Sequence, residues 1–208
     1  FAGMLSMTSC KDDEEVQEQV KHDTTPYNLE YGTFAPPSIP TDNPLSVEGV
    51  KLGRMLFYEK GLSGDGTLAC AGCHRQADAF TDTARFSTGI QGKQGGRQAM
   101  AIFNMLWHEN EFFWDGRAHL LRDQSILPIQ DELEMDETLE NVVAKLSANQ
   151  VYRDQFIRAF GSDVITSEKI SHALEQFMNS IISNQSKYDK YLAGEVQLTE
   201  SELRGKNL

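Results

Sequence analysis

Two cysteines and a histidine stand together in the motif CAGCH, which covers residues 70–74. Cys70 and Cys73 are spaced so that their thiols can reach the two vinyl groups of one porphyrin, and the adjacent His74 then lies under the iron as the proximal ligand. A redox dithiol and one half of a zinc site are the alternatives. A redox CxxC normally opens a helix after a strand, and a zinc site needs a second pair of ligands. The Gly-rich segment before Cys70 and the lack of a second cysteine pair favour a covalently bound c-type haem.

The elements that position this motif follow from the spacing of the apolar residues. Helices are predicted over residues 46–60, 138–148, 150–160 and 167–184. Gly161 is expected to stop the third of these, and Thr166 or Ser167 to cap the start of the fourth. The segment from Gly61 to Gly96 is rich in Gly, Ser, Thr and Asp, as a haem-bearing loop should be. Strand signals are weak, so the predicted fold class is all-α with long loops.

Composition limits the function classes. The chain has 208 residues, of which 39% are hydrophobic and 24% charged, which suits one globular domain with a real core. Its net charge of −12 argues against a nucleic-acid partner, because phosphate binding needs a basic surface. The acidic charge fits either a solvated surface or a docking face for a basic redox partner. The sequence contains no run of about 20 apolar residues, so it predicts no membrane span.

The third cysteine, Cys10, lies in a different context. Residues 1–9 are apolar and small, and an acidic run follows Cys10, as at the end of a bacterial lipoprotein signal. Cys10 is therefore the expected lipidation site, with an incidental cysteine near a chain end as the alternative. Residues 10–42 are expected to form a flexible tether and an extended lead-in, and residues 43–208 the folded domain. Bacteria attach haem covalently outside the cytoplasm, so both features predict a periplasmic or outer-membrane lipoprotein.

Longer motifs carry a resemblance to a known family. The segments LGRMLFYEKGLSGDGTLACAGCH, FFWDGRAHLLRDQSILPIQDELEM and SHALEQFMNSIISNQSKYDKYLAG occur in this order. Together they closely resemble the bacterial di-haem cytochrome c peroxidases, which include the MauG-type enzymes, from about Asn43 to Leu208. The resemblance implies a cytochrome c-like, N-terminal peroxidatic haem domain. In that family a segment like ESELRGKNL leads into a second CxxCH, so the second haem domain is expected to be missing from this chain.

The resemblance implies roles for four further residues. Trp114 matches a tryptophan that lies between the two haems as an electron conduit, and Arg117 of the same motif is expected to bind the cofactor. Gln124 matches a distal-pocket glutamine, and Glu134 a distal glutamate that moves protons during peroxide cleavage. A carboxylate in a poorly solvated pocket suits that task. Taken singly, each residue would more often be structural or solvent-exposed, and only their joint spacing favours the functional assignment.

Two departures from the family pattern matter. The peroxidases carry a histidine that caps the resting peroxidatic iron, and its position falls here on Ile90 or Gln91, neither of which is a good iron ligand. The open haem of MauG-type members is therefore the nearer parallel. The family also implies an inter-domain calcium ion, although Gln98 stands where the peroxidases have an asparagine.

The leading hypothesis is a haem-dependent peroxidase that reduces hydrogen peroxide with electrons from a second c-type haem, refilled by a donor cytochrome or cupredoxin. One alternative is MauG-like, peroxide-dependent oxidation of a partner protein. A simple electron-transfer cytochrome is another, and it requires an axial methionine from Met100, Met105 or Met135. The remaining histidines are expected to be structural or solvent-exposed, namely His22, His108, His119 and His172.

Overall fold

The fold is known from a computed structural model that describes residues 19–109 and 111–208. Its α-helices are α1 (Val47–Phe57), α2 (Cys70–Cys73), α3 (Leu121–Ser125), α4 (Leu127–Gln130), α5 (Leu139–Ala148), α6 (Gln150–Phe160), α7 (Ser167–Ser180), α8 (Lys187–Leu192) and α9 (Glu200–Lys206). Short 3-10 helices are η1 (Lys60–Leu62), η2 (Gln76–Asp78), η3 (Ile90–Gly92) and η4 (Met105–Trp107). Strand-like pairing in the described residues is limited to four isolated bridges. The predicted all-α fold with long loops is confirmed.

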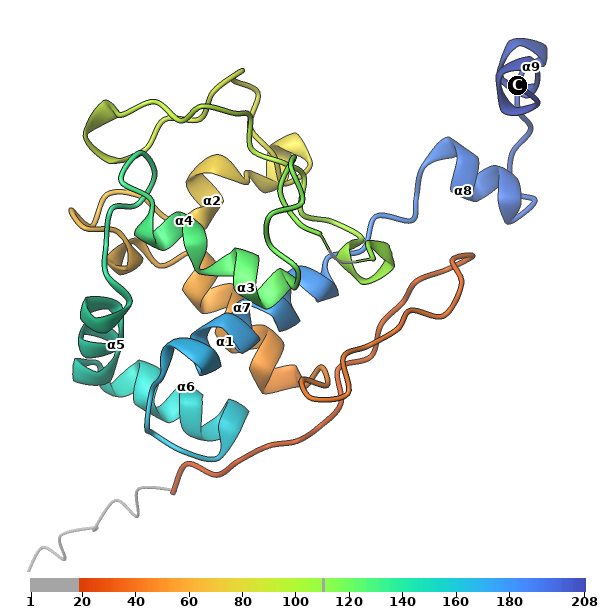
Figure 1. Cartoon of the computed structure of the whole chain (residues 1–208). Helices are drawn as coiled ribbons and strands as arrows, with labels where there is room; N and C mark the ends of the chain where they lie inside the picture. The colour runs from red at the N-terminus through yellow and green to blue at the C-terminus, as the bar shows by residue number, and fades with distance from the viewer. Residues whose placement is uncertain (1–18, 110) are drawn as a thin grey trace, which may run out of the picture.

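Helices α1 and α7 cross at the centre of the molecule, with α6 and α3 packed beside them (Figure 1). Their facing side chains, among them Leu52, Leu56 and Ile170, are fully buried. Gly53 sits at the crossing, where a Cβ atom would lie only 1.9 Å from the carbonyl oxygen of Ala173. The two helices can approach this closely only because that position has no side chain.

The predicted helix boundaries hold for α5 and α6. Thr138 caps α5 by accepting a hydrogen bond from the N–H of Asn141, and Asn149 caps α6 through the N–H of Val151. Gly161 ends α6 in the left-handed conformation with φ of 72°, as the sequence predicted. At α7, Thr166 is the N-cap residue and accepts from the N–H of Lys169.

The predicted end of α7 near Asn184 is wrong, because the helix stops at Ser180. The next residues pair instead with the loop that contains Asn104. The N–H of Asn104 donates to the Ile181 carbonyl oxygen at 2.8 Å, and its side chain both donates to and accepts from the backbone of Ser183. These bonds replace the intrahelical bonds that a longer helix would have made.

The lead-in between residues 19 and 46 passes α6 and then forms a long loop that extends away from the helices and turns back to α1 (Figure 1). Two backbone bonds join it to the body, from the N–H of Asp23 to the Arg158 carbonyl oxygen on α6 and from the N–H of Val47 on α1 to the Thr25 carbonyl oxygen. A third, from the N–H of Tyr27 to the Leu45 carbonyl oxygen, closes a loop within the lead-in. The part of the predicted tether between residues 10 and 18, with Cys10, lies outside the described residues.

At the other end of the chain, α8 and α9 extend away from the helical body (Figure 1). Each begins with a capping box, formed by Ser186 with Asp189 and by Thr199 with Glu202. The ammonium of Lys187 pairs with the Glu202 carboxylate at 2.7 Å and links the two helices. None of the described helices has the length and apolar character that crossing a bilayer requires.

Candidate active site

The two cysteines of CAGCH lie on the single turn of α2, and the N–H of His74 closes this turn on the carbonyl oxygen of Cys70. Burial raises the pKa of the Cys70 thiol to about 12. Burial, together with the nearby Glu134 carboxylate, also raises the pKa of Cys73. A reactive dithiol needs a lowered thiol pKa, so these thiols do not suit a redox CxxC. The described residues also hold no group of three metal-binding side chains, as a zinc site would require.

His74 is held in the form that a metal ligand needs. Its Nδ1 lies 3.2 Å from the carbonyl oxygen of Phe80. A carbonyl oxygen can only accept, so Nδ1 carries the hydrogen and the lone pair is on Nε2. Burial lowers the pKa of His74, which favours the neutral imidazole.

A cavity of about 390 Å³ opens beside α2, within the size range of cofactor sites. Its wall includes Cys73 and His74 together with loop residues 95–102, 112–115 and 117. A smaller apolar hollow adjoins it and is lined by Cys70, Phe57 and Leu174. The two thiols and the imidazole thus face one partly apolar space, which fits a covalently attached porphyrin.

The sequence-predicted site residues meet at this cavity. Gln124, on α3, and Glu134, in the turn between α4 and α5, line both the cavity and the hollow, as do Cys73 and His74. Trp114 and Arg117 line the cavity from the loop before α3. The structure therefore brings together residues that are up to 64 positions apart in the sequence, from Cys70 to Glu134.

The two loop residues lie in different settings. The Trp114 side chain is 63% exposed and its indole N–H donates to the Gln98 carbonyl oxygen at 3.0 Å, so it stands at the rim. The guanidinium of Arg117 stacks on the Phe113 ring at 3.6 Å and pairs with Asp115 at 2.9 Å. Both contacts fix the orientation of Arg117 at the cavity.

Glu134 is the carboxyl group in the cavity wall whose pKa is raised. Its burial raises its pKa, the Asp131 carboxylate adds to the effect, and Arg117 opposes it. A carboxyl group with a raised pKa is a candidate general acid or base. Asp131 itself lines the cavity and was missed by the sequence analysis, although its place three residues before Glu134 in the same turn was a usable signal.

Of the methionines and histidines considered in the sequence analysis, some line the cavity and others do not. Met100 and Met105 line it, whereas Met135 is buried and lines the hollow. His108 packs on the Phe112 ring and His119 pairs with Glu111 at 2.8 Å, and neither is among the lining residues. His22 is exposed, and His172 accepts a hydrogen bond from Arg122.

The positions that depart from the family pattern are also defined. Ile90 is 3% exposed, and its N–H donates to the Glu134 carbonyl oxygen at 2.9 Å. Gln91 is exposed. The Gln98 side chain donates to the Asp82 carbonyl oxygen at 3.0 Å, and calcium at this position stays a prediction.

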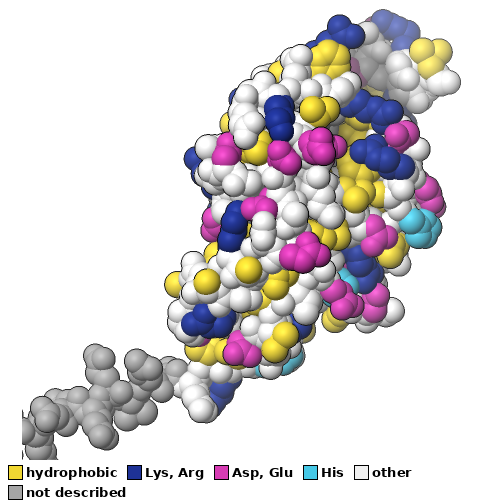
Figure 2. Space-filling view, turned by 60° about the vertical axis from the view of Figure 1, so that its left-hand side comes forward, with side chains coloured by type: hydrophobic (Ala, Val, Ile, Leu, Met, Phe, Trp, Pro, Cys, Tyr) yellow, Lys and Arg dark blue, Asp and Glu magenta, His cyan; other side chains and the backbone are white. Residues whose placement is uncertain are grey.

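Basic and acidic side chains are interspersed over the face drawn in Figure 2, with hydrophobic side chains between them. On this face the net charge of −12 is not gathered into a field of one sign. The acidic docking surface that net charge allowed is therefore not evident on this side of the molecule.

Comparison with known proteins agrees with this geometry. The family model for di-haem cytochrome c peroxidase matches residues 47–197. The methylamine utilization protein MauG of Methylophilus methylotrophus is 35% identical over 173 residues, which are 82% of this chain and 51% of MauG. The cytochrome c551 peroxidase of Nitrosomonas europaea is 35% identical over 166 residues, or 79% of this chain and 49% of that enzyme.

A solved structure is similar as well. A MauG-like protein associated with microbial copper homeostasis has a TM-score of 0.77 and 38% identity, covering 87% of this chain and 53% of that protein. The chain spans about half the length of the curated relatives it matches. The family match over residues 47–197 includes the CAGCH turn and the cavity residues around it. The chain therefore belongs to the di-haem cytochrome c peroxidase family.

Proposed function

We propose that this chain is the peroxidatic domain of a haem enzyme that reduces hydrogen peroxide to water. The observation that carries the proposal is the shared wall of one cavity, where Glu134 and Gln124 stand together with His74. A proton-moving carboxyl group, a neutral amide and an iron-binding imidazole are the set that peroxide cleavage needs. The family name and the similarity to MauG and to a cytochrome c551 peroxidase support it.

Family membership implies a c-type haem, and the residues present fit it. The Cys70 and Cys73 thiols would each add S–H across a vinyl double bond, a step that needs no oxidant and releases no leaving group. His74 would ligate the iron through Nε2, and Arg117 would bind an acidic group of the cofactor. When bound, the haem supplies the redox-active iron at which peroxide is reduced.

The distal residues divide the proton chemistry. Reduction of one hydrogen peroxide consumes two electrons and two protons and yields two water molecules. Glu134 would take the proton from one peroxide oxygen and deliver it to the other, which leaves as water. Gln124 would hold peroxide by hydrogen bonds without competing for that proton, because an amide does not titrate in this range.

The electrons would come from a second c-type haem in another domain of the same protein, refilled by a donor cytochrome or cupredoxin. Trp114 stands at the exposed rim of the cavity, where an aromatic ring could relay electrons between that domain and the site. Its indole hydrogen bond to Gln98 would keep the ring in place.

The test is the reaction of the haem-loaded, full-length protein with peroxide in a stopped-flow instrument. Glu134→Gln should lower the rate constant by about 10²–10⁴-fold, the usual contribution of general acid–base catalysis. The matched control is Glu132→Gln, which removes an exposed carboxylate two residues away. An unchanged rate constant in the Glu134 variant would refute the proposed role.

A second candidate function is MauG-like oxidation of a partner protein. It is favoured by Ile90, which leaves no histidine at the position of the capping ligand of the peroxidases. Mass spectrometry would show a partner modified only when peroxide and this protein are both present. Turnover of peroxide with a small donor and no such modification would exclude it.

An electron-transfer cytochrome is the alternative from another class, since Met100 and Met105 line the cavity. Absorption and EPR spectra of the haem-loaded protein separate the two. A six-coordinate, low-spin haem with a methionine–iron charge-transfer band would overturn the peroxidase proposal, whereas a high-spin signal supports an open distal face.

The proposed location is the bacterial cell envelope, with Cys10 lipidated. The supporting observations are the apolar residues before Cys10 and the haem-attachment motif, which bacteria use outside the cytoplasm. Membrane fractionation of the wild type and Cys10→Ser tests it. Equal release of both into the soluble fraction would refute lipidation.

A further inference from the structure

Backbone hydrogen bonds hold the turn that carries Glu134 to one loop on each of its sides. The N–H of Ile90 donates to the Glu134 carbonyl oxygen at 2.9 Å, and the N–H of Gly64 donates to the Met135 carbonyl oxygen at 2.8 Å. The loop with Gly64 leads directly to Cys70. The position of the Glu134 backbone is thus tied to the segment that holds the attachment motif.

Two glycines allow these loops to touch the turn. A Cβ atom on Gly64 would lie 2.4 Å from the Asp136 carbonyl oxygen, and one on Gly89 would lie 2.0 Å from that of Leu133. Both obstacles are backbone atoms, which cannot move aside as a flexible side chain would. The close approach on each side is therefore a requirement of this arrangement.

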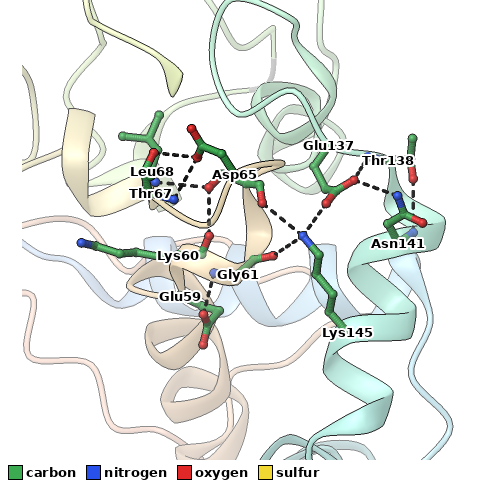
Figure 3. Close-up of polar contacts among 11 residues, drawn as sticks. Glu59, Lys60, Gly61, Asp65, Thr67, Leu68, Glu137, Thr138, Asn141 and Lys145 are labelled. Atoms are coloured by element: carbon green, nitrogen blue, oxygen red, sulfur yellow. Dashed lines mark hydrogen bonds and ion pairs between the residues drawn. The ribbon is translucent and has the colours of Figure 1, made fainter. Parts of the chain in front are cut away.

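Two lysine side chains also bind the turn, one on each side. Lys145 reaches from α5 into the gap between the turn and the loop before Cys70 (Figure 3). Its ammonium donates to the carbonyl oxygens of Gly61 and Ser63, each at 3.1 Å, and to the Glu137 carboxylate. An ammonium has three N–H groups, and here each has an acceptor. On the other side, Lys93 pairs with Asp136 at 2.8 Å.

The loop that Lys145 holds is itself fixed up to the attachment motif. The hydroxyl of Ser63 accepts from the N–H of Leu68 at 3.2 Å, and Asp65 accepts from the N–H of Thr67 at 2.9 Å. Leu68 is two residues before Cys70. A displacement of the carbonyl groups at Gly61 and Ser63 would therefore pass along a short, bonded segment to the haem-binding thiol.

Glu137, which accepts the hydrogen bond from Lys145 on the turn, is also held in place by hydrogen bonds. The Glu137 side chain is 8% exposed, and its second oxygen accepts from the N–H of Thr138 at 2.8 Å and from Asn141 at 3.1 Å. Burial opposes ionisation of this carboxyl group, but the hydrogen bonds from Lys145, Thr138 and Asn141 hold its pKa below the usual range. Glu137 is three residues after Glu134 in the same turn.

We propose that Lys145 is a positioning residue for Glu134, because it fixes the carboxylate turn against the loop that presents the haem-binding cysteines. The proposal rests on the proposed role of Glu134. Stability is not its main contribution, since the Lys145 side chain is 42% exposed and ion pairs at such sites contribute little. Misplacement of a catalytic group by about 1 Å can cost as much as 10²-fold in rate.

The test is a double-mutant cycle in the haem-loaded, full-length protein, with the rate constant for peroxide as the measurement. Lys145→Met keeps the aliphatic stem and removes the three donors, and we expect a loss of about tenfold or more. The same substitution in a Glu134→Gln background should have almost no effect, because the group to be positioned is gone. Lys145→Arg should restore most of the rate.

Lys60→Met is the matched control. Lys60 lies on the neighbouring turn, is exposed, and its ammonium has no polar contact with the residues that the structure describes (Figure 3). This variant should react with peroxide as the wild type does. Haem content and the thermal unfolding midpoint, measured on all variants, separate a misplaced carboxylate from a protein that has lost its fold or its cofactor.

The outcomes distinguish the two proposals. A normal rate in Lys145→Met with a slow Glu134→Gln variant overturns the role of Lys145 alone. Equal losses from Lys145→Met in both backgrounds show that Lys145 does not act through Glu134 and also overturn it. A normal rate in Glu134→Gln refutes the proposed function of that residue. If Lys145→Met lacks haem, Glu137→Met removes the acceptor of the same contact from the turn and must show the same background dependence.

Discussion

The ion-pair cluster between α3 and α7 allows a sharp test of how the fold holds the distal side of the cavity. Arg122, two residues before Gln124, pairs with Asp42 through two bonds of 2.8 and 3.0 Å. Its Nε faces the Glu175 carboxylate at 3.5 Å. Glu175 is buried, with 4% of its side chain exposed, and also accepts from Asn43 at 2.7 Å. Arg122 thus has one solvated and one buried carboxylate partner.

Because one carboxylate is exposed and the other buried, substitutions of Asp42 and Arg122 should have unequal effects on the free energy of unfolding. Asp42 is 65% exposed, so Asp42→Asn should change the free energy of unfolding very little, because solvent screens such a pair. Arg122→Met should cost about 3–5 kcal/mol, because it leaves the Glu175 carboxylate buried without its cation. For a domain of this size the larger loss corresponds to a fall in the unfolding midpoint of roughly 6–20 °C.

Thermal unfolding followed by circular dichroism measures these differences in the haem-loaded protein. Arg54→Met, on the exposed side of α1, is the control. Arg122→Met with Glu175→Gln should recover most of the loss, since no buried charge then remains. Equal, small effects of Arg122→Met and Asp42→Asn would refute the reasoning.

Three further predictions follow from the site and the helix crossing. Peroxide reactivity should fall as the pH falls through the raised pKa of Glu134, because only the ionised carboxylate accepts the proton. Stopped-flow rates should show this inflection at a higher pH than an ordinary glutamate would give, and Glu134→Gln should remove it. Cys70→Ala or Cys73→Ala should each leave one thioether, seen as a shift of the pyridine haemochrome band, and acidified acetone should extract haem from the double variant only. Gly53→Ala should cost about 1–3 kcal/mol in thermal unfolding because its Cβ would lie 1.9 Å from a carbonyl oxygen of α7, whereas Gly205→Ala, in open space on α9, should not destabilise the protein.

Local sequence signals were sufficient where a helix is governed by its own residues. The spacing of apolar residues predicted α5 and α6, Gly161 predicted the end of α6, and Thr166 was one of two residues predicted to cap α7. The end of α7 could not be predicted in this way. Its carbonyl at Ile181 is bonded to Asn104, a partner 77 positions away that no periodicity reveals.

The site residues also divide into those that local sequence predicts and those that depend on distant contacts. The CAGCH motif identifies its own chemistry, whereas Gln124 and Glu134 could be joined to it only through the family resemblance. Lys145 could not be found at all, since its contacts to Gly61 and Ser63 span 84 and 82 residues. A lysine on an amphipathic helix looks like any solvated charge until its acceptors are known.

The buried Ile90 has a consequence for how such a site can be regulated. Its N–H holds the backbone of Glu134, so a loop that swung away from this position would release the carboxylate turn at the same moment. A histidine placed here as a removable cap would have to give up that anchoring contact in order to move. If Glu134 has the proposed role, gating by this loop and anchorage of the Glu134 backbone would be competing uses of the same loop, and in this chain the Ile90 N–H provides the anchorage.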